Sequence, residues 1–254
     1  MDNSIVKKQS VYAPQEQLIL GNVLGSAHYG LADEWSDQDV CYLLMPSKQD
    51  LIRGRKPQRL LFMEQCDVSM FDIRSLMFFI AEGDINKLGL LFNDDCMYVA
   101  PQFKDFVDQL IARREDLINT ISPSIHAWAL NMFEYKLGQI HYYKDAEEKY
   151  KQFGYNTKNV AQAIYYVRIA MQYFINRNYS VENPMLKAYD CSGFRDEILD
   201  IKHGKYSEEE AVAIAEAEYA KLIGITNLGR NLNAGWVQQM IYGEIEKMLG
   251  ITLI

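Results

Sequence analysis

The sequence has few of the features that would place it in several common protein classes. Only four of its 254 residues are cysteines, scattered without paired spacing, which argues against a disulfide framework or a zinc site. No apolar run approaches the roughly 20 residues of a membrane span, and the first residues do not open a signal peptide. We therefore expect a cytoplasmic protein with no membrane contact and no bound zinc.

Positive charge is also scarce. The 26 lysines and arginines are outnumbered by 34 aspartates and glutamates, which leaves a net charge of −8. A general nucleic-acid binder is more often basic, so any contact with a polynucleotide must come from a local patch. The apolar fraction of 49% is ordinary for a globular protein, and the length allows one large domain or two small ones.

The most informative stretch runs from residue 24 to 40. Gly25-Ser26 follows an apolar, strand-like run at 18–24, and Asp37 and Asp39 lead into a second run at 40–44. In a strand, residues i and i+2 point to the same side, so the two carboxylates would repel each other unless a cation lies between them. Carboxylate oxygens suit Mg²⁺, and a Gly-Ser turn can offer N–H groups and a hydroxyl to phosphate oxygens. The stretch predicts phosphoryl or nucleotidyl transfer.

These residues carry a family resemblance. Gly25-Ser26, then Gly30, then Ser36-Asp37-x-Asp39 is similar to the signature of the DNA polymerase β-like nucleotidyltransferases. The longer form, Gly-Ser-x-x-Tyr-Gly-Leu-Ala followed by Ser-Asp-x-Asp, most resembles the predicted nucleotidyltransferases of the branch associated with RNA repair. The resemblance implies an α+β protein: a small mixed β-sheet core of the polymerase β palm type, followed by a mostly α-helical domain.

The same resemblance implies a set of ligands and site residues. Two Mg²⁺ ions, with Mn²⁺ as a substitute, would lie between Asp37, Asp39 and a nucleoside triphosphate such as ATP. A third carboxylate comes from a neighbouring strand, for which the segment 67–72 offers Asp67 and Asp72. The family has an acidic residue at the start of this strand, which favours Asp67 as the metal ligand. Asp72 would then serve the start of the following helix.

The resemblance also implies roles in nucleotide binding. Gly25 and Ser26 would hold the β- and γ-phosphates, Gly30 would allow a close backbone turn, and Ser36 would orient the start of the Asp37 strand. Lys158, at the start of a helix, is either a triphosphate contact or an exposed lysine. Similarity is strong only over residues 24–40, so the substrate class is not carried over.

A basic cluster follows the second strand. Its members are Arg53, Arg55, Lys56 and Arg59. They form either a solvated loop or an electrostatic guide for a phosphate-bearing substrate that enters the site.

The remainder of the chain has helical spacing. Helices are expected from Pro101 onward, over 158–176, over 207–223 with a capping box of Ser207 and Glu210, and over 233–249. We therefore expect a nucleotidyltransferase domain at residues 1–100 and a helical domain at 101–254.

Two functional classes fit this pattern. The first is a Mg²⁺-dependent enzyme that moves a nucleoside monophosphate from a nucleoside triphosphate to a hydroxyl on RNA, protein or a small molecule and releases pyrophosphate. The second is a catalytically silent relative that binds a nucleotide or a partner with the same fold. The presence of all three acids favours the enzyme. A metal-dependent phosphohydrolase, with water as the nucleophile, is a third possibility that product analysis would separate from transfer.

Overall fold

The computed structural model describes most of the chain. The described residues are 4–10, 17–28, 30–33, 36–56, 58–63, 66–92, 94, 96–142, 147–176, 192–226, 228 and 234–251. The chain forms two compact units, one of residues Met1–Ile121 with Asn231–Ile254 and the other of Ser122–Arg230.

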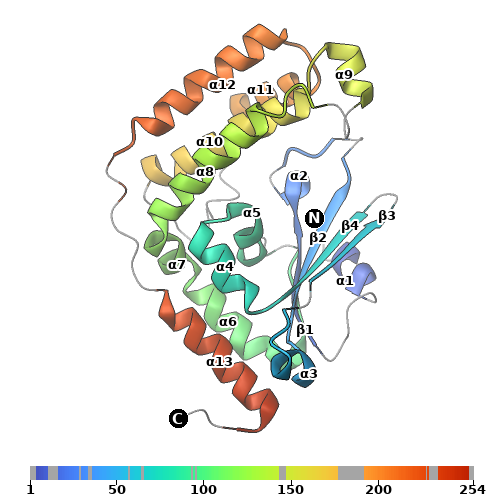
Figure 1. The fold of residues 1–254 in the computed structure, drawn as a ribbon, viewed down its shortest axis with the longest axis vertical. Coiled ribbons are helices and arrows are strands. Elements are labelled where there is room, and N and C mark those ends of the chain that lie inside the picture. Colours follow the sequence, from blue (N-terminus) through green and yellow to red (C-terminus); the bar gives the residue numbers. More distant parts are fainter. Residues whose placement is uncertain are drawn as a thin grey trace. The chain divides into compact units, whose positions relative to one another are not determined.

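The first unit is built around a five-stranded sheet (Figure 1). Its strands are β1 (Leu18–Leu24), β2 (Gln38–Leu44), β3 (Gln58–Met63), β4 (Cys66–Asp72) and β5 (Tyr98–Val99). They are arranged in the order β3-β4-β2-β1-β5. Strands β2 and β4 are parallel, whereas the other neighbouring pairs are antiparallel. The sheet is therefore mixed, as expected.

The two apolar runs of the sequence, at 18–24 and 40–44, lie in the central strands β1 and β2. All seven residues of β1 are buried, and so are the last five of β2. Val23, Val40 and Val68 stand opposite one another on β1, β2 and β4 and belong to one hydrophobic core. Strands that are buried on both faces read as continuous apolar runs, which is why the sequence revealed them. The two-residue strand β5 was too short to be predicted.

Helices lie on both faces of this sheet. On the face that carries Val40 and Tyr42, the Tyr42 hydroxyl donates a 2.5 Å hydrogen bond to the carbonyl of Val6 in α1. On the other face, the buried side chain of Asn22 donates to the carbonyl of Leu90 at 3.0 Å. The helices of the unit are α1 (Ser4–Gln9), α2 (Gly25–His28), α3 (Lys48–Ile52), α4 (Ser75–Glu82), α5 (Ile85–Leu88), η2 (Gly89–Leu91), η3 (Pro101–Phe103), α6 (Lys104–Ala112), α7 (Arg114–Thr120) and α13 (Gly235–Leu249).

The second unit is helical in its described part. It contains α8 (Ser122–Leu137), α9 (Glu147–Phe153), α10 (Thr157–Asn176), α11 (Ser192–Lys202) and α12 (Glu208–Ile223), and α10 packs against α8, α11 and α12. The predicted capping box is confirmed: Ser207 Oγ accepts from the N–H of Glu210, and the Glu210 carboxylate accepts from the N–H of Ser207.

The chain is thus an α+β protein with a mixed sheet and a largely helical remainder, as expected. The structural units do not coincide with the expected division at residue 100, because α6, α7 and the C-terminal α13 belong to the unit of the sheet. The boundaries of functional domains stay a prediction. In the described part of the chain, no helix has the length and apolar character needed to cross a membrane.

Candidate functional site

Two of the three predicted carboxylates lie side by side at the start of the central strands. Asp39 on β2 and Asp67 on β4 are direct partners in the parallel register, so their Cα atoms stand on neighbouring strands about 4.8 Å apart. Both side chains are half-buried. Alternation puts Cys41 and Ser69 behind them on the same face of the sheet. Strand pairing has thus brought together two acids that are 28 residues apart in the sequence.

Gly25 closes the other side of Asp39. Gly25 is the first residue of α2, and its φ is +64°. Residues that carry a side chain disfavour this backbone conformation. A Cβ at this position would lie 2.0 Å from Asp39 Oδ2 and 2.9 Å from Asp39 Cγ. Only glycine leaves room for the carboxylate here. The Gly-Ser turn and the carboxylate pair therefore form one site, with the glycine directly against the acid.

The loop between α2 and β2 is held by short hydrogen bonds. The N–H of Leu31 donates to the Ser26 carbonyl at 2.8 Å. Further along, Ser36 Oγ donates to Asp33 Oδ1 at 2.8 Å and accepts from the N–H of Asp33 at 3.1 Å. This turn ends next to Asp37, which is exposed and directly precedes β2. Ser36 thus contributes to the turn that precedes Asp37.

Gly30 also has a positive φ, of +71°, but its surroundings differ from those of Gly25. No atom lies within 4 Å of a Cβ built at Gly30. The residue is exposed, and its N–H donates to the carbonyl of Ala27 at 3.3 Å. Gly30 serves the backbone turn, whereas Gly25 makes space for a functional side chain.

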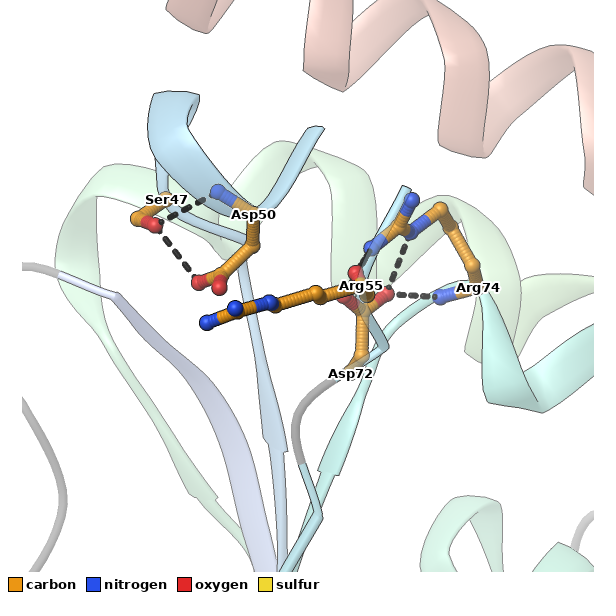
Figure 2. A network of polar contacts seen from close by, with 5 residues as sticks. All are labelled: Ser47, Asp50, Arg55, Asp72 and Arg74. Atoms are coloured by element: carbon orange, nitrogen blue, oxygen red, sulfur yellow. Dashed lines mark hydrogen bonds and ion pairs between the residues drawn. The ribbon is translucent and has the colours of Figure 1, made fainter. Parts of the chain in front are cut away.

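Asp72, the alternative third carboxylate, lies at the opposite end of β4 in a polar network (Figure 2). Its side chain is fully buried. Asp72 Oδ1 accepts from the backbone N–H of Arg74 and from Arg74 Nε, both at 2.8 Å, and Oδ2 accepts from Arg74 Nη2 at 2.6 Å. This ion pair raises the pKa of Arg74. Asp72 holds the connection between β4 and α4 and is not at the site of Asp39.

The basic cluster lies toward the Asp72 end as well. Arg59 on β3 pairs with Met70, and the residues before β3 lie farther along in the same direction. The carbonyl of Arg55 accepts a hydrogen bond from Arg74 Nη2 (Figure 2). The cluster is therefore placed away from the carboxylate pair, and its location does not favour a role as guide to that site.

The structure reveals two neighbours of the carboxylate pair that we did not predict. Phe62 on the edge strand β3 is the direct partner of Asp67, and its side chain is 78% exposed. Leu60, two residues earlier on the same face, pairs with Ser69 and is 51% exposed. Only the pairing of β3 with β4 places an exposed aromatic ring beside Asp67.

Burial and charge shift the pKa values of the cysteines around the pair. Burial raises the pKa of Cys41 to about 11, and the negative charge of Asp39 adds a small contribution. Burial, followed by the charges of Asp67 and Asp39, also raises the pKa of Cys66. Both thiols therefore stay protonated near neutral pH and are poor nucleophiles.

Lys158 belongs to the second unit, where it is exposed in the first turn of α10. Burial and the nearby charge of Lys158 lower the pKa of Lys136 on α8. The ends of the two helices are tied by a 3.1 Å hydrogen bond from Asn159 Nδ2 to the carbonyl of Gln139. Lys158 thus has a second lysine beside it, which the sequence did not indicate.

The donor set fits one hard divalent cation. Mg²⁺ ordinarily takes one or two protein carboxylates and completes its shell with water and substrate oxygens, and Asp39 and Asp67 supply such a pair. Across the described ranges, no three His, Cys, Asp or Glu side chains are grouped closely enough to hold a metal ion. The predicted set of Asp37, Asp39 and Asp67 is therefore not assembled as a three-residue centre in this structure.

Comparisons with known proteins add little. No protein-family model matches the chain, and no curated protein matches its sequence. Among solved structures, a nucleotidyltransferase-like protein from Exiguobacterium sibiricum 255-15 aligns over 96% of this chain and 78% of its own, with a TM-score of 0.35 and 9% identity. A likeness this weak supports no conclusion, so the inference of function depends on the motif and the geometry of the site.

Proposed function

We propose that this protein is a metal-dependent nucleotidyltransferase whose site lies at the Asp39 and Asp67 end of the sheet. The observation that carries the proposal is that Gly25, directly after β1, lies against the Asp39 carboxylate on β2, and that Asp39 pairs with Asp67 on β4. A glycine turn that accommodates a carboxylate, next to a second carboxylate, is suited to a nucleoside triphosphate bound through a divalent cation.

Within this proposal each residue has a definite task. Asp39 and Asp67 would hold Mg²⁺, with Asp37 as an additional ligand when a nucleotide is bound. The bound cation would lower the pKa of the acceptor hydroxyl and neutralise charge on the phosphates. Gly25 and Ser26 would hold the phosphates from the β1 side. The transfer forms a bond between the acceptor oxygen and the α-phosphorus, breaks the bond to pyrophosphate and releases the hydroxyl proton.

The row of strands also predicts the side from which the acceptor arrives. Attack at phosphorus places the acceptor oxygen and the leaving oxygen roughly in line on opposite sides. With the phosphates at Gly25 on the β1 side, the acceptor would approach from β4 and β3. Asp67 and the exposed ring of Phe62 lie on that side.

The test is nucleotide transfer by the whole chain. The protein is incubated with each α-labelled nucleoside triphosphate, Mg²⁺ or Mn²⁺, and separate RNA and protein acceptor pools. We expect label transfer and pyrophosphate release that are lost in Asp39→Asn. Asp105→Asn, which removes an exposed carboxylate on α6, is the matched control and should retain activity. Release of label as free nucleotide would indicate a hydrolase. Binding without turnover in every pool would favour the silent relative, and absence of nucleotide binding would refute the proposal.

A further inference from the structure

Two apolar side chains of β3, the edge strand of the sheet (Figure 1), are exposed beside the carboxylate pair. Phe62 is 78% exposed and Leu60 is 51% exposed. The alternate residues Leu61 and Met63 are half-buried and pack against the hydrophobic core. One face of β3 is thus anchored in the core, whereas the other presents an aromatic ring and an aliphatic side chain to solvent. Exposed apolar side chains that adjoin one another mark interaction sites more often than isolated ones do.

The register places the ring of Phe62 within reach of the carboxylates. Phe62 is the direct partner of Asp67 in the antiparallel pairing of β3 with β4, and Asp67 is the direct partner of Asp39 on β2. Directly opposite residues of two paired strands share one face, with Cβ atoms about 5 Å apart. Phe62 therefore stands one strand from Asp67 and two strands, about 10 Å, from Asp39. A ring at this position can contact a nucleoside whose hydroxyl lies at a cation between the two acids.

The position of Phe62 favours a contact with the acceptor over one with the nucleoside triphosphate. Gly25 lies against Asp39 from the β1 side, where the proposed function places the phosphates. Phe62 lies beyond Asp67 on the opposite side, from which in-line attack brings the acceptor. A phenylalanine side chain offers a flat apolar ring and no hydrogen bond. It is suited to stack on another flat ring, and a nucleobase provides one.

The basic cluster lies farther along the same edge of the sheet. Gln58 shares the face of Phe62 and lies about 13 Å from it along β3. Arg55 and Lys56, just before β3 in the chain, are exposed. In a protein with a net charge of −8, such a local group of cations suits the phosphates of a polynucleotide. Its distance from Asp67 does not suit a reacting triphosphate, but it suits the upstream phosphates of a polynucleotide whose end lies at Asp67.

We propose that the exposed face of β3 binds the end of a single-stranded nucleic acid as the acceptor, with Phe62 stacked on its terminal nucleobase and its upstream phosphates directed toward Arg55 and Lys56. The inference rests on the proposed function and deepens it by naming the acceptor class. Stacking holds the terminal sugar hydroxyl near Asp67 without reading the base, because every nucleobase has a π-face. A protein or small-molecule acceptor would leave the cations without phosphates to bind.

The experiment measures binding of a short, fluorescent, single-stranded RNA to the full-length protein with Mg²⁺ by anisotropy. We expect Phe62→Ala to weaken binding about tenfold or more, and Phe62→Trp to bind within about threefold of the wild type. The matched control is Phe78→Ala, which should bind as the wild type does. Phe78 is 58% exposed, on the side of α4 away from its buried residues. Urea midpoints of the four proteins should coincide, which separates lost binding from lost folding.

The salt dependence of binding tests the direction of the polynucleotide. Lys56→Gln should reduce the slope of log K against log salt by about one. The same substitution should have no effect on a dinucleotide, which is too short to reach from Phe62 to Lys56, whereas Phe62→Ala should weaken binding of both RNAs. A DNA oligonucleotide of the same sequence shows whether the 2′-hydroxyl is read. An unchanged salt slope in Lys56→Gln would overturn the assigned direction.

Steady-state kinetics provide the last readout. Phe62→Ala should raise the KM for the oligonucleotide acceptor and leave the KM for the nucleoside triphosphate unchanged. Unchanged binding in Phe62→Ala, or absence of binding of either nucleic acid to the wild type, would overturn the inference. Transfer to a protein or small-molecule acceptor that is indifferent to Phe62→Ala would overturn it while leaving the proposed function intact. Phe62-dependent RNA binding by a protein that binds no nucleoside triphosphate would support the stacking face and refute the proposed function.

Discussion

The two ends of strand β4 carry the same residue type in opposite circumstances. Asp67, at the start of β4, is half-buried beside the carboxylate of Asp39 and the exposed ring of Phe62. Asp72, at the end of β4, is fully buried and bound through both oxygens to Arg74. Five residues, about 16 Å along a strand, separate a carboxylate that lies beside another carboxylate from one that is bound to a cation.

This difference teaches how to separate structural acids from functional ones. A buried carboxylate with a cation partner stabilises the fold, and its charge is already neutralised. Two adjacent carboxylates repel each other, and a divalent cation bound between them would relieve that repulsion. The comparison therefore predicts that substitutions at the two ends affect different quantities.

The largest expected effect is on activity at the Asp67 end. Asp67→Asn or Asp39→Asn should lower kcat/KM for nucleotide transfer by about 10³-fold or more, which is about 4 kcal/mol. The free energy of unfolding should stay constant or rise slightly, because the repulsion between the two carboxylates is removed. Transfer assays and urea titrations of the same samples measure both quantities. If a variant at Asp67 or Asp39 lost activity only in proportion to its loss of stability, the proposed difference between the two ends of β4 would be refuted.

The next effect is on stability at the Asp72 end. Asp72→Ala should lower the free energy of unfolding by about 3 kcal/mol, because it leaves Arg74 without its buried partner. The shift of the urea midpoint at constant m-value measures this loss. At temperatures where the variant is folded, the KM for nucleotide should match the wild type. A changed KM in folded protein would show that the Asp72 end takes part in substrate binding.

A third prediction compares two glycines. Gly25→Ala should lower activity by about 100-fold, because the new methyl group would displace the Asp39 carboxylate, and displacements of about 1 Å have effects of this size. Gly30 also has a positive φ, but a Cβ at this position would lie in open space. We therefore expect a different result for Gly30→Ala. It should lower stability by about 1 kcal/mol while activity is retained. Kinetics and thermal unfolding of the pair provide the test, and equal activity in the two variants would contradict it.

The smallest effect concerns pH and Cys41. The pKa of its thiol is raised from 9.0 to about 11, so folding favours the protonated form. The stability from this group is complete below pH 9 and is lost as the pH rises through about 11. Asp39→Asn should lower the thiol pKa slightly, whereas Asp72→Asn should leave it unchanged. Thiolate absorbance as a function of pH measures this, and an equal response to both substitutions would contradict the comparison.

Local patterns in the sequence were sufficient to predict the central strands β1 and β2 and the candidate acids. The run at 18–24 coincides with β1, and the second run at 40–44 begins two residues after the start of β2 and ends with it. The Ser207 and Glu210 capping box was readable because it depends on residues three apart. The first residue of a helix is harder to predict where no such pair of residues exists. Helix α8 begins at Ser122, although Ser124 is also a residue type that caps helices.

Pairing between distant segments decided the rest. Whether Asp67 or Asp72 stands beside Asp39 depends on the register of β2 with β4, and a shift of one residue would turn every side chain to the other face. The exposed ring of Phe62 lies beside Asp67 only because β3 pairs with β4 in this register. Nothing near Phe62 in the sequence indicates this neighbour.

The sequence by itself therefore determined an α+β protein with a glycine turn and an acidic pair ahead of a buried strand, because these features depend on neighbours within a few residues. Tertiary structure alone decided that Gly25 makes room for Asp39, that Asp67 joins it, and that Asp72 is neutralised by Arg74. Hydrophobic burial drives these strands together without specifying charges. The charges that meet at each end of the sheet follow from the register in which the strands pair.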